Sequence, residues 1–208
     1  MVVCVYVVIQ FLVVAAWPVE YQFLHHTISD LGWTECTVEQ RSVGVLASCS
    51  PWHALFNIGS AVCMVLLAGA GIGLRSAIES WWARYGYVGL WILTAASWVG
   101  SSAIPGNVDL GLHVLVSLPA FFTQLAVLPL IAWTMRRTAP RFAMAAAVAA
   151  ALTASGFVAF VFAMGGYAPV GLTERLALES IFGWAAAAAL LGPGPSPRSP
   201  RDVVPVPS

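Results

Sequence analysis

Residues 111–133, GLHVLVSLPAFFTQLAVLPLIAW, form an apolar run without a single Asp, Glu, Lys or Arg. An α-helix crosses the ~30 Å hydrocarbon core of a bilayer with about 20 residues, because it rises 1.5 Å per residue. Backbone amides and carbonyls find no water in that core, so they must pair within the segment, as they do in a helix. The run therefore predicts a membrane-spanning helix.

Five further apolar runs of similar length accompany this one. They occupy residues 1–17, 52–74, 86–104, 142–164 and 172–191. Of the 208 residues, 60% are hydrophobic and 9% are charged, whereas soluble domains carry about 25% charged residues. We therefore predict an all-α, polytopic integral membrane bundle of about six transmembrane helices. Residues 1–17 lack a basic start, which favours a retained helix over the alternative, a cleaved signal peptide.

The arginine distribution predicts the orientation of this bundle. All nine basic residues are arginine, and seven of them lie in the gaps after the second and fourth runs or in the C-terminal tail. The positive-inside rule places these segments in the cytoplasm. We therefore expect a plasma-membrane protein with cytoplasmic N- and C-termini, an outer loop at residues 18–51, and a disordered proline-rich cytoplasmic tail at residues 192–208.

Polar residues gather at the predicted outer face. His25 and His26 lie in the 18–51 loop, and His53 and His113 lie at the outer ends of the second and fourth helices. Polar side chains inside a bilayer usually face the bundle interior. We therefore expect an outward-facing polar cavity. The candidate ligand-binding residues are His26, Asp30, Asn57, His113, Gln124 and Glu179.

Two cysteines, Cys36 and Cys49, lie in the same predicted outer loop. The outer compartment permits disulfide formation, and a bridge would close a short loop over the cavity. Both a disulfide and two free thiols fit the sequence.

Several short motifs together resemble a known family. They are HTISDLG at residues 26–32, Ser50-Pro51, Phe56-Asn57, Ile104-Pro105 and His113. This set resembles the multi-pass prokaryotic membrane proteins grouped as "domain of unknown function 998" (DUF998), over residues 5–190. The resemblance implies a six-helix fold but no established activity. Two features depart from the family: Ile104 stands where an aromatic residue is common, and the segment between the loop cysteines is additional.

Two classes of function fit these observations. The first is a membrane protein that binds or handles a lipid or small amphiphile in the cavity. The second is a zinc-dependent intramembrane lipid hydrolase, because a catalytic zinc needs about three protein ligands and one open position for water. His53, His113 and Asp30 are the candidate zinc ligands, and Ser29, Asp30 and Ser101 are the candidate catalytic residues.

Two further features bear on function, the intramembrane Glu179 and the overall charge. The intramembrane Glu179 also allows a proton-coupled transporter, although no inverted repeat accompanies it. The nine basic and nine acidic residues balance, so the charge predicts no nucleic-acid partner.

Overall fold

The computed structural model describes residues 1–41, 43–78, 80–166 and 169–191. The expected disordered tail at residues 192–208 lies outside the described residues. The described part is helical apart from one small β-hairpin and the connections, so the prediction of an all-α bundle is confirmed at the level of fold class. Its α-helices are α1 (Val2–Ala15), α2 (His53–Gly73), α3 (Trp81–Ala103), α4 (Leu110–Met135), α5 (Pro140–Met164) and α6 (Val170–Leu191).

Three helical segments are long and apolar enough to cross a membrane: His53–Ala77, α4 and α5. The first combines α2 with the short 3-10 helix η2 (Leu74–Ala77). Helix α1 is apolar but has only 14 residues. Helix α3 begins at Trp81 rather than near residue 86, so its first two turns hold Trp81, Trp82 and Tyr85.

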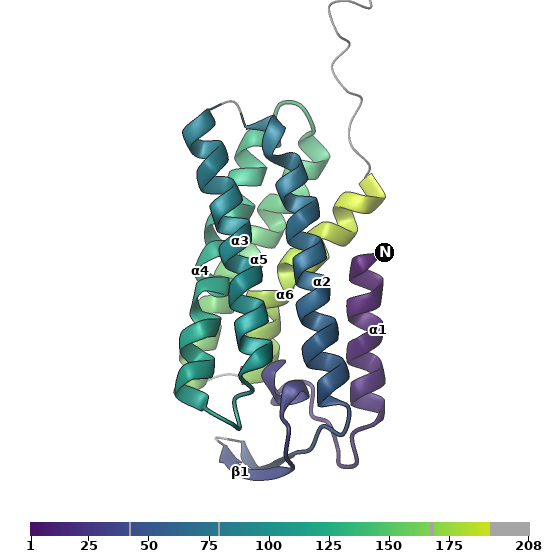
Figure 1. The fold of residues 1–208 in the computed structure, drawn as a ribbon. Coiled ribbons are helices and arrows are strands. Elements are labelled where there is room, and N and C mark those ends of the chain that lie inside the picture. Colours follow the sequence, from purple (N-terminus) through teal and green to yellow (C-terminus); the bar gives the residue numbers. More distant parts are fainter. Residues whose placement is uncertain (42, 79, 167–168, 192–208) are drawn as a thin grey trace, which may run out of the picture.

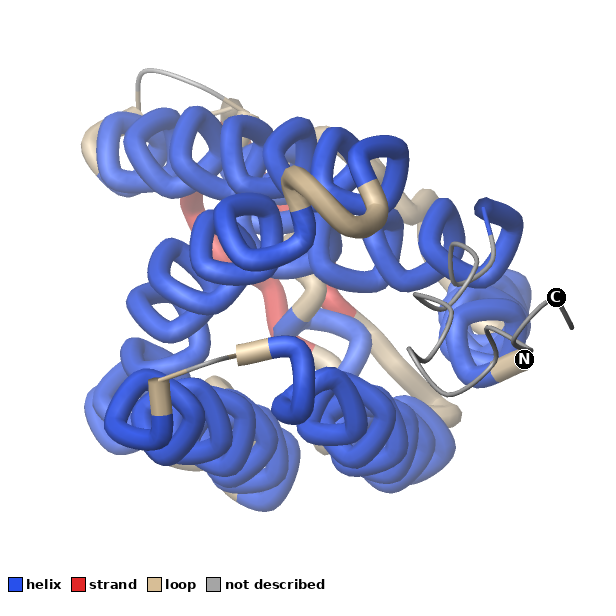
Figure 2. Tube along the Cα trace, turned by 90° about the horizontal axis from the view of Figure 1, so that it is seen from above, coloured by secondary structure: helices blue, strands red, loops and turns tan. Residues whose placement is uncertain are grey.

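Consecutive helices pack side by side along one bundle axis, and α1 lies at the edge beside α2 (Figure 1). The hairpin lies across one end of this bundle, where it is seen behind the helices when the molecule is viewed from above (Figure 2). Small residues bring α5 and α6 close together. A Cβ on Gly156 of α5 would lie 2.5 Å from the backbone nitrogen of Ala177 in α6, so only glycine fits that crossing.

The 18–51 loop contains structure that the sequence analysis did not predict. A 3-10 helix, η1 (Ser29–Gly32), is followed by strands β1 (Thr37–Arg41) and β2 (Gly44–Ser48). The strands are antiparallel, with Thr37 opposite Ser48 and Arg41 opposite Gly44. Gly44 has φ +113°, a conformation that glycine adopts without strain. Alternate residues of β1 are partly buried, as expected for a strand with one covered face.

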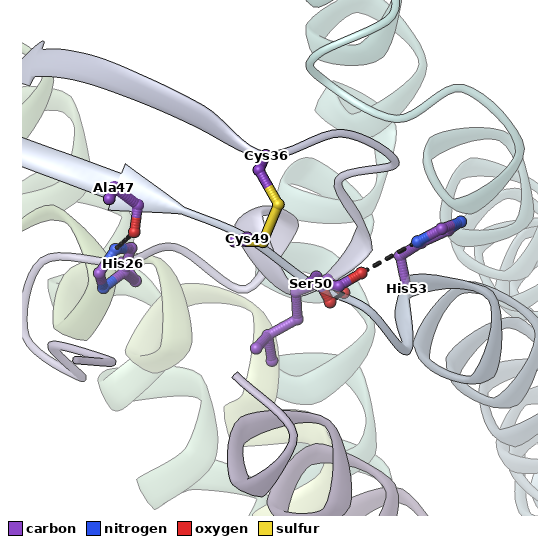
Figure 3. Close-up of a disulfide and its surroundings, with 7 residues drawn as sticks. His26, Cys36, Ala47, Cys49, Ser50 and His53 are labelled. Carbon is purple, nitrogen blue, oxygen red and sulfur yellow. Dashed lines mark hydrogen bonds between the residues drawn. A yellow bond between two sulfur atoms is a disulfide. The ribbon is translucent and has the colours of Figure 1, made fainter. Parts of the chain in front are cut away.

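A disulfide links Cys36, just before β1, to Cys49, just after β2 (Figure 3). The remaining cysteines, Cys4 and Cys63, are free. The disulfide therefore joins the two ends of the hairpin at the point where the loop returns to α2.

Candidate functional site

A cavity of about 680 Å³ lies between the 18–51 loop and helices α2 to α6. Its volume is in the range of small-molecule binding sites. Ser29, Asn57, His113 and Glu174 supply polar groups where the loop meets the helix ends. Deeper in the bundle the walls are apolar, with Phe121, Phe157, Phe160 and Leu178 among the lining residues. Phe121 lies eleven residues beyond the start of α4, which is about 16 Å along the helix.

Three elements meet at the hydroxyl of Ser29 in η1. The Ser29 Oγ atom lies 3.0 Å from Nε2 of His113 in α4. It also lies 3.2 Å from Oε1 of Glu174 in α6. The second carboxylate oxygen of Glu174 accepts the backbone N–H of Ile28. These bonds fix the polar end of the cavity across the loop and two helices.

The orientation of the His113 ring follows from its second hydrogen bond. Nδ1 lies 2.6 Å from the carbonyl oxygen of Ile104, at the end of α3. A carbonyl oxygen can only accept, so Nδ1 carries a hydrogen. In the neutral ring, Nε2 therefore presents its lone pair to Ser29. The imidazole is almost fully buried, with 8% of the residue exposed.

Asp30 lines the cavity, but its carboxylate is already hydrogen-bonded to other groups of the loop. Arg41 donates to both oxygens at 2.9 Å, and the backbone N–H of Thr27 donates to Oδ2 at 2.8 Å. The residue is 1% exposed. Asp30 thus joins η1 to the hairpin, and both of its carboxylate oxygens already accept hydrogen bonds within the loop.

The structure does not assemble the expected zinc site. His53 Nδ1 lies 2.9 Å from the carbonyl of Ser50 at the start of α2 (Figure 3), and His53 does not line the cavity. Within the described ranges, no group of three or more His, Cys, Asp or Glu residues is placed to hold a metal ion. The prediction that His53, His113 and Asp30 converge is therefore wrong, because each is bound to a different part of the fold.

His26 binds other parts of the loop and does not line the cavity. Its Nδ1 accepts the backbone N–H of Gln22 at 2.9 Å, and its Nε2 lies 3.2 Å from the carbonyl oxygen of Ala47 in β2 (Figure 3). The ring is fully buried, and this burial lowers the pKa of His26 below its ordinary value. A neutral His26 therefore links the hairpin to the segment that follows α1.

The other ligand-binding candidates divide into two groups. Asn57 lines the cavity and donates to the carbonyl of Gly32 at 2.9 Å. Gln124 and Glu179 do not line it. Glu179 instead accepts hydrogen bonds from Tyr6 at 2.8 Å and from Gln10, which attach α1 to α6.

Ser101 lines the cavity, but its hydroxyl donates to the carbonyl of Trp98 in its own helix. Two important residues were missed. Glu174 was not among the candidates, although its place at the start of α6 puts it level with His113. Arg175 was not among the candidates either, and it donates to the carbonyls of His26 at 2.7 Å and Gly171 at 3.0 Å.

The fold and cavity define an all-helical protein whose apolar helices suit a membrane and whose polar residues meet at one end of the bundle. Comparison with protein-family models, curated proteins and solved structures finds no match of any of the three kinds. The resemblance to the domain-of-unknown-function family therefore stays a prediction based on the loop motif.

Proposed function

We propose that this is an integral membrane protein that binds a lipid or small amphiphile in the cavity. The observation that carries the proposal is the distribution of chemistry within that single space. Hydrogen-bonding groups of Ser29, Asn57 and His113 lie at one end, and aromatic rings line the other. A ligand with a polar head and an apolar chain matches both ends at once, whereas a fully polar solute would leave the aromatic wall unpaired.

The outer surface of the helices supports placement of the whole bundle in a bilayer. Large apolar side chains are exposed on α1, α2, α3, α4 and α5, with Phe11, Ile58, Ile92, Leu115 and Val158 each more than half exposed. Soluble proteins rarely expose so much contiguous apolar surface, but lipid tails cover it without cost. All six helices are proposed to cross the plasma membrane, with the loop end outside because most arginines lie at the opposite end.

A pair of substitutions on α4 tests the proposed binding. Ser117 lines the cavity, and Leu115, two residues earlier, is 63% exposed on the outer surface. Ser117→Phe places an aromatic ring in the space that the amphiphile would occupy, whereas Leu115→Phe adds the same ring to the lipid-facing side. Native mass spectrometry of the detergent-purified protein, titrated with a single-chain lysophospholipid at constant micelle concentration, counts the molecules bound.

We expect one saturable lysophospholipid adduct on the native protein. Ser117→Phe should weaken this binding at least about tenfold, which corresponds to about 1.4 kcal/mol. Leu115→Phe should bind as the native protein does. Equal binding by both variants would place the amphiphile outside the cavity, and absence of any saturable adduct on the native protein would reject the proposal.

A further inference from the structure

We propose that Ser29 is a nucleophile and His113 its general base, and that together they hydrolyse an acyl ester of the bound amphiphile. This activity rests on the proposed function, because the cavity must first hold the ester beside Ser29. It needs no metal ion. It differs in this respect from zinc chemistry, for which the described residues offer no set of three or more ligands.

The geometry of the two side chains carries the inference. The 3.0 Å separation between Ser29 Oγ and His113 Nε2 is within hydrogen-bond reach, as required of a nucleophile and its base. The carbonyl of Ile104 holds the hydrogen on Nδ1, so the neutral ring directs a basic lone pair at the hydroxyl. The backbone carbonyl thus orients the ring, a task that an aspartate performs in many serine hydrolases.

The Ser29 hydroxyl lies between Glu174 and His113. The hydroxyl has a single hydrogen, yet its oxygen lies within hydrogen-bond distance of both His113 and Glu174. In the structure the hydroxyl donates to Oε1 of Glu174, so its hydrogen must turn to Nε2 of His113 before His113 can act as the base. Until that turn, Glu174 holds the hydroxyl 3.0 Å from Nε2 of His113. Glu174 is therefore a positioning residue in this proposal.

Ser29 also differs from the serines that have only a helical role. The hydroxyls of Ser101, Ser117 and Ser155 donate to carbonyls of their own helices, which is the usual behaviour of serine inside a helix. Ser29 is bonded instead to two titratable side chains from distant elements. It is only partly buried and faces the cavity, so a bound ester can reach it.

Apart from the ester, water is the only reagent that the reaction consumes. A bond forms between Ser29 Oγ and the ester carbonyl carbon as the bond from that carbon to the alcohol oxygen breaks. The serine proton passes to His113 Nε2 and then to the departing alcohol. Water next attacks the acyl-serine, giving its proton through His113 back to Ser29. The products are a carboxylic acid and an alcohol.

Labelling with a fluorophosphonate, which reacts with activated serines, tests the inference directly. The full-length protein is treated in detergent, and peptide mass spectrometry locates the phosphonyl group. Hydrolysis of p-nitrophenyl decanoate is followed in parallel. Ser29→Ala and His113→Gln are compared with Ser155→Ala, an exposed serine on α5, and with His53→Gln, a histidine outside the cavity.

We expect the phosphonyl group on Ser29. Labelling and hydrolysis should fall at least about 100-fold in His113→Gln and to background in Ser29→Ala, and both should be unchanged in the two control variants. Native protein without an adduct on Ser29 overturns the inference, and so does equal labelling in His113→Gln. Native mass spectrometry with a non-hydrolysable ether lysophospholipid separates the two proposals: saturable ether-lipid binding without labelling rejects the activity alone, and labelling without ether-lipid binding rejects the proposed function.

Discussion

Arg41 of β1 donates two parallel hydrogen bonds to Asp30 of η1. They run from Nη1 and Nη2 to the two carboxylate oxygens, and each is 2.9 Å long. The Asp30 side chain is 1% exposed and the Arg41 side chain 17%. This ion pair joins the hairpin to η1, the segment that carries Ser29. The loop is therefore held in place by a buried ion pair as well as by the chain itself.

Loss of Arg41 should destabilise the protein strongly. Arg41→Leu leaves the Asp30 carboxylate buried without its charged partner, a change that typically costs about 3–5 kcal/mol. Arg41 also bonds Glu39, whose side chain is 42% exposed, so Glu39→Gln should cost less than about 1 kcal/mol. Thermal unfolding in detergent measures both variants. Similar melting temperatures for the two would show that the Asp30 pair does not stabilise the loop.

Reduction of the disulfide should loosen the hairpin. Cys36 and Cys49 are 13 residues apart, and a closed loop of about 15 residues contributes roughly 3 kcal/mol by restricting the unfolded chain. A reductant should therefore lower the melting temperature of the native protein and have no effect on Cys36→Ala/Cys49→Ala. A reductant effect of equal size in the double variant would assign the change to something other than this bridge.

Stability should fall as the pH falls below the ordinary His26 pKa of 6.5. Burial lowers the pKa of His26 in the folded protein, so between pH 6.5 and the lowered value the unfolded state binds more protons. Neutral His26 thus stabilises the fold above pH 6.5, and this contribution is lost on acidification. The nearby Asp30 carboxylate opposes the shift and Arg41 adds to it. The melting temperature between pH 7.5 and 5.5 should drop more in the native protein than in His26→Gln; equal drops would contradict the assignment.

Gly156 should tolerate no side chain at the α5–α6 crossing. A Cβ there would lie 2.5 Å from Ala177 N and 2.6 Å from the Leu176 carbonyl carbon, and backbone atoms cannot move aside as a flexible side chain would. Gly156→Ala should therefore separate the helices and lower the melting temperature. Gly69→Ala is the matched control, because nothing lies within 4 Å of its added Cβ and alanine suits a helix better than glycine does. A harmless Gly156→Ala would show that α5 and α6 pack less closely.

Local sequence patterns predicted much of the fold and only part of the site. Long apolar runs indicate helices because lipid forces backbone groups to pair within each segment, and the described α-helices lie at those runs. The β-hairpin was missed because its strands have only five residues each and their alternation is weak beside the apolar runs. Asn57 and His113 line the cavity, whereas Gln124 and Glu179 do not, since helical spacing alone does not fix how a helix is rotated about its axis.

The sequence by itself determined that the chain is helical, apolar enough for a membrane, and polar at one end, because these properties follow from composition and from the spacing of residues along single helices. Only the tertiary structure decided which polar groups meet. It directed Asp30 to Arg41, His26 to Gln22 and Ala47, and Glu179 to Tyr6 and Gln10. It brought Ser29, His113 and Glu174 together from three elements. These contacts depend on helix rotation and on the path of the loop, which are set by packing between elements that can lie far apart in the sequence, as Ser29 and Glu174 do.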